Sequence, residues 1–222
     1  EEILPKLAAY EVGDVVSKVT CDEAYVLPGD SYKVALLDYG AKNNIARSLN
    51  KRGCEVTVYP AHTKAEEILA THPDGIMLSN GPGDPKTCTD IIEEVRKLYE
   101  SDVPIFAICL GHQLMALANG GDTHKLKYGH RGGNHPVKNL LTGKVEITSQ
   151  NHSYAVSTDG IEKTRVEITH INLLDQTVEG LRIDEDRIFS TQYHPESASG
   201  PEDSKYLFGL FIHNMEAMKE GR

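Results

Sequence analysis

The sequence VPIFAICLGHQ, residues 103–113, passes from an apolar run to a helical pattern at Cys109. A continuous apolar run of this length is typical of a strand that is covered on both faces. Cys109 then occupies a sharp strand-to-helix turn, which holds a nucleophile clear of its own backbone. The N–H groups at the start of the following helix favour a thiolate. This stretch therefore predicts an α/β fold and a candidate reactive thiol.

A cysteine at the end of a strand is, taken alone, most often a small buried apolar residue. The residues after Cys109 favour a functional role. Gly111 allows the turn to approach neighbouring strands closely, and His112 and Gln113 place polar side chains on the first helical turn. Polar groups at this position are unusual for a corner that is merely packed.

Strand and helix patterns alternate on both sides of this corner. Upstream, strands are expected over 34–37, 56–59, 75–79 and 103–108, and helices over 43–51, 90–99 and 110–119. Thr63 and Glu66 form a capping-box pattern, which predicts that one further short helix begins there. This order of elements implies a parallel sheet with right-handed crossovers.

The second half of the chain has short strand patterns separated by turns. Strands are expected over 123–128, 145–148, 165–171, 178–183 and 188–192, followed by an amphipathic helix over 204–219. The predicted fold class is α/β, with a three-layer, mostly parallel sheet, helices on both faces and an antiparallel edge in the second half.

The first residues differ from the rest. Residues 1–31 have short helical patterns without a buried-strand signal, and the chain starts with Glu1 rather than methionine. We therefore expect 1–31 to be a linker region from a missing N-terminal domain and 32–222 to be one α/β domain, since 222 residues are few for two domains.

Composition excludes several classes of function. A net charge of −10 argues against nucleic acid as a partner. No apolar run approaches the ~20 residues that span a membrane, and no signal peptide is visible. The four cysteines form neither a C-x-x-C pair nor a metal-ligand spacing, which favours a reduced, cytoplasmic setting.

A second candidate group follows the strand over 188–192. His194 is fixed toward extended geometry by Pro195, and Glu196 lies two positions on. Taken alone, each residue most often has no functional role: such a histidine is usually at the surface or hydrogen-bonded in the core, and such a carboxylate is usually solvated in a turn. Together with Cys109 they supply a base and the group that orients it.

The loop Asn80 to Pro85 follows the third strand. Gly-Pro-Gly is turn chemistry wherever it occurs, so a plain surface turn is one interpretation. The other is that its glycines let backbone N–H groups face a ligand. The N–H groups of Gly81 and Leu110 would then form an oxyanion hole.

Two polar clusters carry weaker signals. The glycine-rich segment 129–136 is expected to be a loop, and its His130 and His135 lack a third ligand at metal spacing, so no metal is assigned. The segment 150–154 is polar and turn-like, and most such segments are loops without a ligand.

Taken together, three motifs resemble the signatures of class I, triad-type glutamine amidotransferases: Cys109 to Gln113, Asn80 to Pro85, and His194 to Glu196. The resemblance runs from about Tyr32 to the C-terminus. Within that class the chain looks most like the carbamoyl-phosphate synthase small subunits, through the segments 38–44, 132–138 and 150–154.

The resemblance implies a role for each motif residue. Cys109 is the nucleophile, His194 the base and acid, and Glu196 its orienter, while Gly81 and Leu110 supply the oxyanion-hole amides. The substrate-binding positions are Gly81, Gly83, Leu110, Gln113, Asn151, Ser153 and Tyr154. Ser153 and Tyr154 stand where relatives often carry Gly and Phe; if the contacts there are backbone, both changes should be tolerated.

The implied activity is hydrolysis of L-glutamine to glutamate and ammonia through a γ-glutamyl thioester. The ammonia would serve a carbamoyl-phosphate synthase large subunit, the expected partner, which makes carbamoyl phosphate for pyrimidine and arginine synthesis. No cofactor is expected in this chain, because it has no phosphate-binding Gly-x-x-x-x-Gly-Lys loop; ATP would be used by the partner. The absent N-terminal domain contributes to the glutamine site in the family, so this chain alone is expected to bind glutamine poorly.

Two other functions fit the same residues. One is a γ-glutamyl peptidase or an amidotransferase that feeds another synthetase. The other is a regulatory module on an inactive amidotransferase scaffold, which the intact Cys109 disfavours.

Overall fold

The computed structural model describes residues 3–8, 13–159, 161, 165–184 and 187–221. Parts of the predicted linker, residues 1–2 and 9–12, lie outside the described residues. The helices are α1 (Ile3–Ala8), α2 (Asn43–Asn50), α3 (Ala65–Leu69), α4 (Thr89–Tyr99), α5 (Leu110–Ala118) and α6 (Tyr206–Lys219), with 3-10 turns η1 (Val16–Lys18) and η2 (Pro85–Thr87). None of the described helices is long and apolar enough to cross a lipid bilayer.

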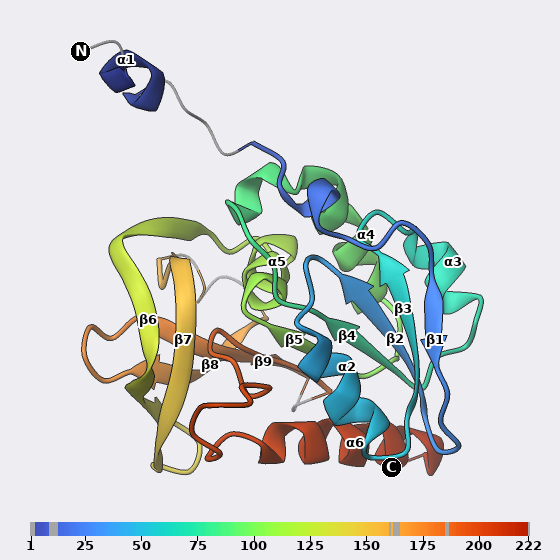
Figure 1. Ribbon diagram of the computed structural model, residues 1–222. Helices are drawn as coiled ribbons and strands as arrows, with labels where there is room; N and C mark the ends of the chain where they lie inside the picture. Colours follow the sequence, from blue (N-terminus) through green and yellow to red (C-terminus); the bar gives the residue numbers. More distant parts are fainter. Residues whose placement is uncertain (1–2, 9–12, 160, 162–164, 185–186, 222) are drawn as a thin grey trace.

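A ten-stranded sheet runs through the molecule in the order β1-β3-β2-β4-β5-β10-β9-β7-β6-β8 (Figure 1). Its strands are β1 (Tyr25–Leu27), β2 (Lys33–Asp38), β3 (Glu55–Pro60), β4 (Gly75–Leu78), β5 (Ile105–Ile108), β6 (Thr123–Asn139), β7 (Val145–Val156), β8 (Glu167–Asn172), β9 (Val178–Ile183) and β10 (Ile188–Thr191). Every strand and helix predicted from residue 32 onward is present, with boundaries that differ by a few residues or, in β6 and β7, by more.

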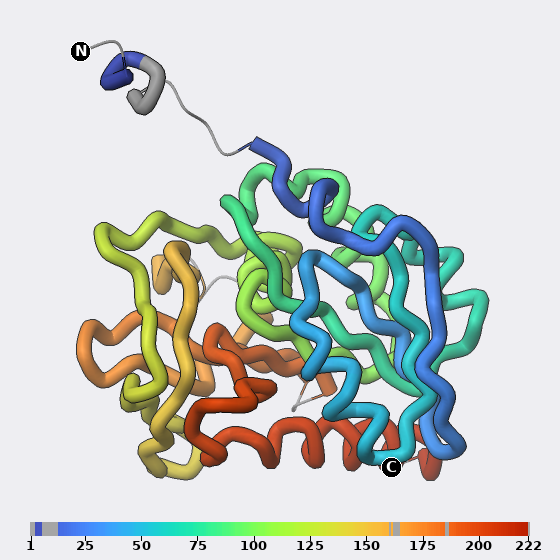
Figure 2. The backbone as a smooth tube through the Cα atoms, in the orientation of Figure 1, coloured from blue at the N-terminus to red at the C-terminus, as the bar shows by residue number. Residues whose placement is uncertain are grey.

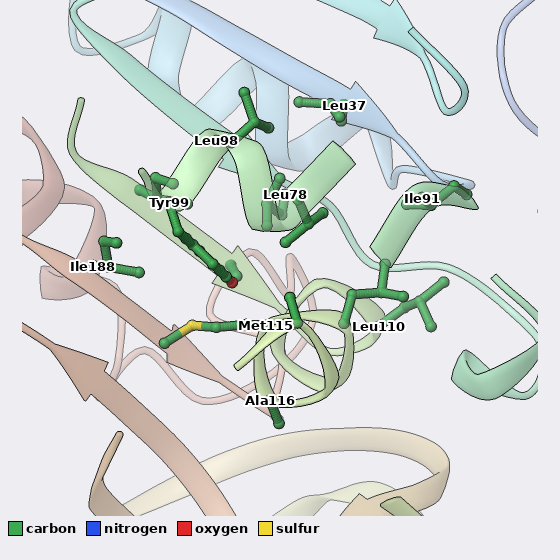
Figure 3. Close-up of a cluster of buried hydrophobic side chains, with 14 of the residues drawn as sticks. Leu37, Leu78, Ile91, Leu98, Tyr99, Leu110, Met115, Ala116 and Ile188 are labelled. Atoms are coloured by element: carbon green, nitrogen blue, oxygen red, sulfur yellow. The ribbon is translucent and has the colours of Figure 1, made fainter. Parts of the chain in front are cut away.

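The central strands are parallel and buried on both faces. β3, β2, β4, β5 and β10 pair in parallel, and β2, β4, β5 and β10 are almost entirely buried. Alternate residues of β5 belong to different core clusters: Ile105 and Ala107 lie with α4 and α5, whereas Phe106 and Ile108 lie with α2 and α6. The two-sided burial explains why these strands read as continuous apolar runs. Figure 3 shows the first cluster around Tyr99, Leu110 and Met115.

The prediction of a mostly parallel sheet is wrong, because β9, β7, β6 and β8 pair in antiparallel fashion and make up much of the sheet. The glycine-rich segment 129–136 and the polar segment 150–154 are not loops; they belong to β6 and β7, which form a long hairpin (Figure 2). The hairpin has register shifts between Lys125 and His130 and between Gly132 and His135. These bulges and the exposed polar faces of both strands hide the strand pattern.

The N-terminal segment contains a strand that its sequence does not reveal. β1 pairs antiparallel with β3 at the edge of the sheet (Figure 1). Its residues Tyr25 and Val26 are about half exposed, as in an edge strand that buries little. Nearby, Val16 is 1% exposed and belongs to the main core cluster. This segment therefore joins the core through Val16 and the edge of the sheet through β1.

The predicted capping box at α3 is wrong. The Thr63 hydroxyl donates to the Pro60 carbonyl, and Lys64 is the N-cap residue. The carboxylate that accepts the Ala65 N–H, at 2.9 Å, is Glu94 from α4. A side chain from a distant helix thus replaces the local cap.

Replacing Glu94 with Gln is expected to destabilise the fold by about 2 kcal/mol at neutral pH, since charge-assisted hydrogen bonds contribute more than neutral ones. Lys64 and Lys97 also contact this carboxylate, at 3.2 and 3.0 Å. Burial raises the pKa of Glu94, but the Ala65 N–H and the two lysines outweigh it and lower the pKa to about 2. A lowered pKa means that the stabilisation is present above the unfolded value and disappears as the pH falls toward 2. Urea unfolding between neutral and acidic pH tests this; a variant as stable as the parent chain at pH 7 rejects it.

Candidate active site

Cys109 lies at the turn between β5 and α5 in a strained conformation. Its φ of 54° is positive, which is uncommon for a residue with a side chain. The Cys109 N–H donates to Thr191 and its carbonyl accepts from Gln113, which ties the turn to β10 and to the helix. Strain of this kind is found where the surrounding structure fixes a functional residue.

Gly111 makes this turn possible, as its sequence position predicts. Its N–H donates to the Ser79 carbonyl at 3.0 Å. A Cβ at Gly111 would lie only 2.5 Å from the Leu78 carbonyl oxygen, so no larger residue fits without a shift of the backbone. The corner is therefore held tightly against the end of β4.

His194 and Glu196 form a buried pair just beyond β10. His194 Nδ1 and Glu196 Oε1 are 2.7 Å apart, and both side chains are at most 2% exposed. Lys42 Nζ lies 3.3 Å from the same carboxylate oxygen, and the Asn44 side-chain amide donates to the Glu196 carbonyl. Glu196 thus fixes the imidazole so that Nε2 is its free nitrogen.

Cys109 and His194 line one cavity of about 420 Å³, together with Val19, Gly40, Lys42, Asn80, Gly81, Pro82, Gly83, Asn151 and Ser153. His194 Nε2 is buried without a hydrogen-bond partner of ordinary geometry among the described residues. Burial lowers the pKa of His194, but the charge and contact of Cys109, followed by those of Glu196, raise it well above its ordinary value. An imidazolium beside a thiolate is the arrangement that activates a cysteine nucleophile.

Two backbone N–H groups lie beside Cys109. Gly81 and Leu110 are neighbours, since a Cβ on Gly81 would lie 2.6 Å from Leu110 Cδ2. Neither N–H donates a hydrogen bond within the described part of the chain. The Leu110 side chain points into the core (Figure 3), so only its backbone is available to a ligand. These groups can stabilise an oxyanion that forms next to the sulfur.

A cysteine, an oriented histidine and the backbone N–H groups of Gly81 and Leu110 thus lie together at this cavity. The family model "Glutamine amidotransferase class-I" matches residues 35–214, which include every residue named above as lining the cavity except Val19. The chain belongs to the class I glutamine amidotransferase family.

Two relatives of this amidotransferase chain are carbamoyl phosphate synthase small chains. The protein of Listeria monocytogenes serovar 1/2a is 53% identical over 222 residues, all of this chain, and that of Bacillus cereus strain ATCC 10987 is 54% identical over 220 residues, 99% of this chain. The chain spans about 61% and 60% of the length of these relatives. The solved structure of a putative GMP synthase component from Thermoplasma acidophilum has the same fold, with a TM-score of 0.73 over 86% of this chain and 97% of that one at 22% identity.

The predicted substrate-binding residues of the amidotransferase site fall into two groups. Gly81, Gly83, Asn151 and Ser153 line the cavity. Leu110, Gln113 and Tyr154 are not among the residues that line it; Gln113 Nε2 donates to the Tyr154 carbonyl at 2.8 Å and to Gln192 Oε1 at 2.9 Å. The first of these hydrogen bonds joins α5 to β7, the strand that carries Asn151 and Ser153.

Three contributions to the site were not predicted from the sequence. Lys42 belongs to the segment 38–44, yet its contact with the carboxylate of the His194–Glu196 pair was not expected. Val19 lines the cavity from the segment predicted as a linker. His152 holds the Tyr154 carbonyl through Nδ1 at 2.7 Å. Lys42 and His152 belong to the segments 38–44 and 150–154, but the partner of Lys42 is Glu196 in the turn after β10, and that of His152 is Tyr154 in the same strand.

The histidines of β6 meet other residues than expected. His130 lies with His152 and Glu179 rather than only with His135, and one donor atom from each of the three is within 4.8 Å of the others. Hydrogen bonds engage most of these atoms: His152 Nε2 contacts Gln150, and both Glu179 oxygens accept amide N–H groups, from Gln150 and Asn172. The expectation that His130 and His135 lack a third ligand concerned their spacing in the sequence; the cluster that the structure forms contains His130 without His135, and the assignment of no metal stays a prediction.

Proposed function

We propose that this chain is a glutaminase domain that hydrolyses L-glutamine to glutamate and ammonia through a γ-glutamyl thioester on Cys109. The observation that carries the proposal is that Cys109 and His194 line the same cavity, while the His194 imidazole contacts the buried Glu196 carboxylate. Its chemistry suits transfer of an acyl group from an amide, since it combines a nucleophile, a proton donor and free backbone N–H groups.

The first half-reaction forms the thioester. The Cys109 thiolate attacks the carboxamide carbon of glutamine, and the carbonyl oxygen becomes an oxyanion that accepts hydrogen bonds from the N–H groups of Gly81 and Leu110. The C–N bond then breaks as the His194 imidazolium donates its Nε2 proton to the leaving nitrogen, which departs as ammonia. Each oxyanion donor contributes about 3 kcal/mol in comparable enzymes.

The second half-reaction regenerates the enzyme. Neutral His194 accepts a proton from a water molecule, which attacks the thioester carbonyl. The C–S bond breaks, glutamate leaves, and the thiolate–imidazolium pair returns. Throughout, Glu196 keeps the imidazole oriented. Burial raises the pKa of the Glu196 carboxyl, but the contacts and charges of His194 and Lys42 lower it overall, which favours the carboxylate.

We further propose that the ammonia serves a carbamoyl-phosphate synthase large subunit, which would use ATP and bicarbonate to make carbamoyl phosphate. Support comes from the 53% identity over the whole of this chain to a protein named as a small chain of that enzyme. The chain itself needs no cofactor for the chemistry above.

Adding a carbamoyl-phosphate synthase large subunit is expected to raise glutamate release by about tenfold, a typical coupling between linked sites. Glutamate and ammonia are measured with the chain alone, with the large subunit, and with ATP and bicarbonate, where carbamoyl phosphate should form from glutamine. Faster release of glutamate from γ-glutamyl peptides than from glutamine, or no response to the large subunit, would overturn the proposal.

A further inference from the structure

A second cavity, of about 300 Å³, lies between α6 and the strands β6, β7, β8 and β10 (Figure 1). We call it the α6 cavity, because Tyr206, Leu207 and Leu210 of that helix form one of its walls. It shares no lining residue with the cavity at Cys109. The proposed bond-breaking steps therefore make no use of it, and its chemistry has to be read from its own residues.

Two buried polar side chains of the α6 cavity have an atom without a partner. Glu146 on β7 is 7% exposed and His170 on β8 is 5% exposed, and both line the cavity. Glu146 Oε2 and His170 Nε2 are buried without a hydrogen-bond partner of ordinary geometry among the described residues. A buried carboxylate oxygen in this state binds an N–H donor favourably, because its desolvation is otherwise uncompensated.

The surroundings of Glu146 favour a positively charged donor. Burial raises the pKa of the Glu146 carboxyl by more than contact with Tyr206 lowers it, and the charge of Asp203 raises it further. His170 supplies no positive charge at neutral pH, since burial lowers its pKa to about 4. Asp203 is engaged elsewhere, because its Oδ2 accepts the Ile147 N–H at 2.9 Å. A ligand ammonium would supply both the proton donor and the charge that Glu146 lacks.

Lys144 adds a positive charge at the rim of the α6 cavity. It is exposed, lines the cavity and forms no ion pair among the described residues. Lys144 precedes Glu146 by two positions at the start of β7, and residues two apart in a strand share a face and lie about 7 Å apart. A buried carboxyl and an outer ammonium at this separation match the two charged groups of a zwitterion.

The rest of the wall is largely apolar. Leu207 and Phe189 are buried, and Leu141 lies partly exposed, so apolar surface extends from the interior to the rim. Leu210 belongs to the same wall. A few polar groups set in an apolar cavity are typical of small-molecule sites, where the polar groups fix the orientation of an apolar body.

We propose that the α6 cavity binds an α-amino acid with an apolar side chain. The ammonium of the ligand donates to Glu146 Oε2, its carboxylate accepts from the Lys144 ammonium, and its side chain packs on Leu207 and Leu210. Glutamine does not fit this description, because its side-chain amide would lie against leucines without a partner. The inference does not depend on the proposed glutaminase activity, since the two cavities have no residue in common.

Calorimetry on the full chain tests the proposal with L-leucine and L-phenylalanine as probes. Three analogues of leucine each lack one feature: 3-methylbutylamine has no carboxylate, 4-methylpentanoate has no ammonium, and glycine has no side chain. We expect each analogue to bind about tenfold more weakly than L-leucine, because each loses one charged hydrogen bond or the apolar contact. No binding of either amino acid at millimolar concentration, or glycine binding as tightly as L-leucine, overturns the proposal.

Two substitutions assign the charged groups. Glu146→Gln is expected to weaken L-leucine and 3-methylbutylamine about tenfold and to leave 4-methylpentanoate unaltered. Lys144→Ala should weaken L-leucine and 4-methylpentanoate about threefold, a smaller effect because Lys144 is exposed, and should leave 3-methylbutylamine unaltered. The matched controls are Glu216→Gln and Lys138→Ala, which remove exposed charges from α6 and β6 outside the cavity.

Thermal unfolding of each variant shows whether the fold is kept. Unchanged affinity of Glu146→Gln for L-leucine, or an equal loss of affinity for all three ligands in that variant, overturns the proposal. If Glu146→Gln does not fold, the analogues on the parent chain and on Lys144→Ala decide: 3-methylbutylamine or 4-methylpentanoate binding the parent chain as tightly as L-leucine would then reject a site for a zwitterion.

Discussion

Cys109→Ser is expected to abolish glutamine hydrolysis, with kcat lower by about 10⁴-fold or more, as for loss of a nucleophile in comparable hydrolases. A hydroxyl at this position is not ionised at neutral pH, so the neighbouring imidazolium cannot activate it as it does a thiolate. The fold should be preserved, because serine is close to cysteine in size and Cys109 already adopts its φ of 54° within a turn held by Gly111 and Thr191. Glutamate release and the unfolding midpoint give the two measurements.

Cys54→Ala is the control for that experiment. Cys54 is a fully buried free cysteine that does not line the cavity. The Cys54→Ala variant should be less stable than the parent chain, because the substitution leaves a space in the core, but its kcat should be unchanged. Hydrolysis by Cys109→Ser at a rate near that of the parent chain would refute the assignment of the nucleophile.

His194→Asn is expected to lower kcat for glutamine by about 10⁴-fold as well, since members of a catalytic triad act as a unit. The variant has neither the proton donor for the leaving ammonia nor the cation beside the thiolate. Alkylation of Cys109 by iodoacetamide at neutral pH should also slow, because a nearby positive charge favours the reactive thiolate. That second readout separates loss of the imidazolium from general damage to the fold.

His213→Asn serves as the matched histidine control. His213 is about two-thirds exposed on α6 and does not line the cavity. Its variant should match the parent chain in both glutamate release and alkylation. Normal alkylation of Cys109 in the His194 variant would contradict the proposed thiolate–imidazolium pair, even if turnover were lost.

Most of the parallel part of the fold could be predicted from the sequence. β2, β4 and β5 are buried on both faces, so their apolar runs stand out, and the glycines at 53 and 120 mark helix ends through their positive φ. β1 could not be predicted, since an edge strand of three residues with two exposed side chains has no buried pattern. The length of β6 was hidden because most of its side chains are exposed and two register shifts break its alternation.

The motifs of the site could be predicted because they are local. Cys109 and the His194–Glu196 pair each occupy a turn after a strand, and the parallel pairing of β5 with β10 brings those turns together. Contacts between distant segments had no such signal. Glu94 on α4 caps α3, Lys42 contacts Glu196, and Arg131 contacts Ser153, and each of these pairs depends on tertiary packing.

Trapping the acyl intermediate is the most direct test of the proposed chemistry. The full chain with a large subunit is mixed with L-glutamine, quenched in acid within the first turnover, and digested for mass spectrometry. We expect one γ-glutamyl group in thioester linkage to Cys109, absent from Cys109→Ser. Turnover of glutamine without any adduct in the parent chain, or an adduct on another residue, would contradict a thioester on Cys109.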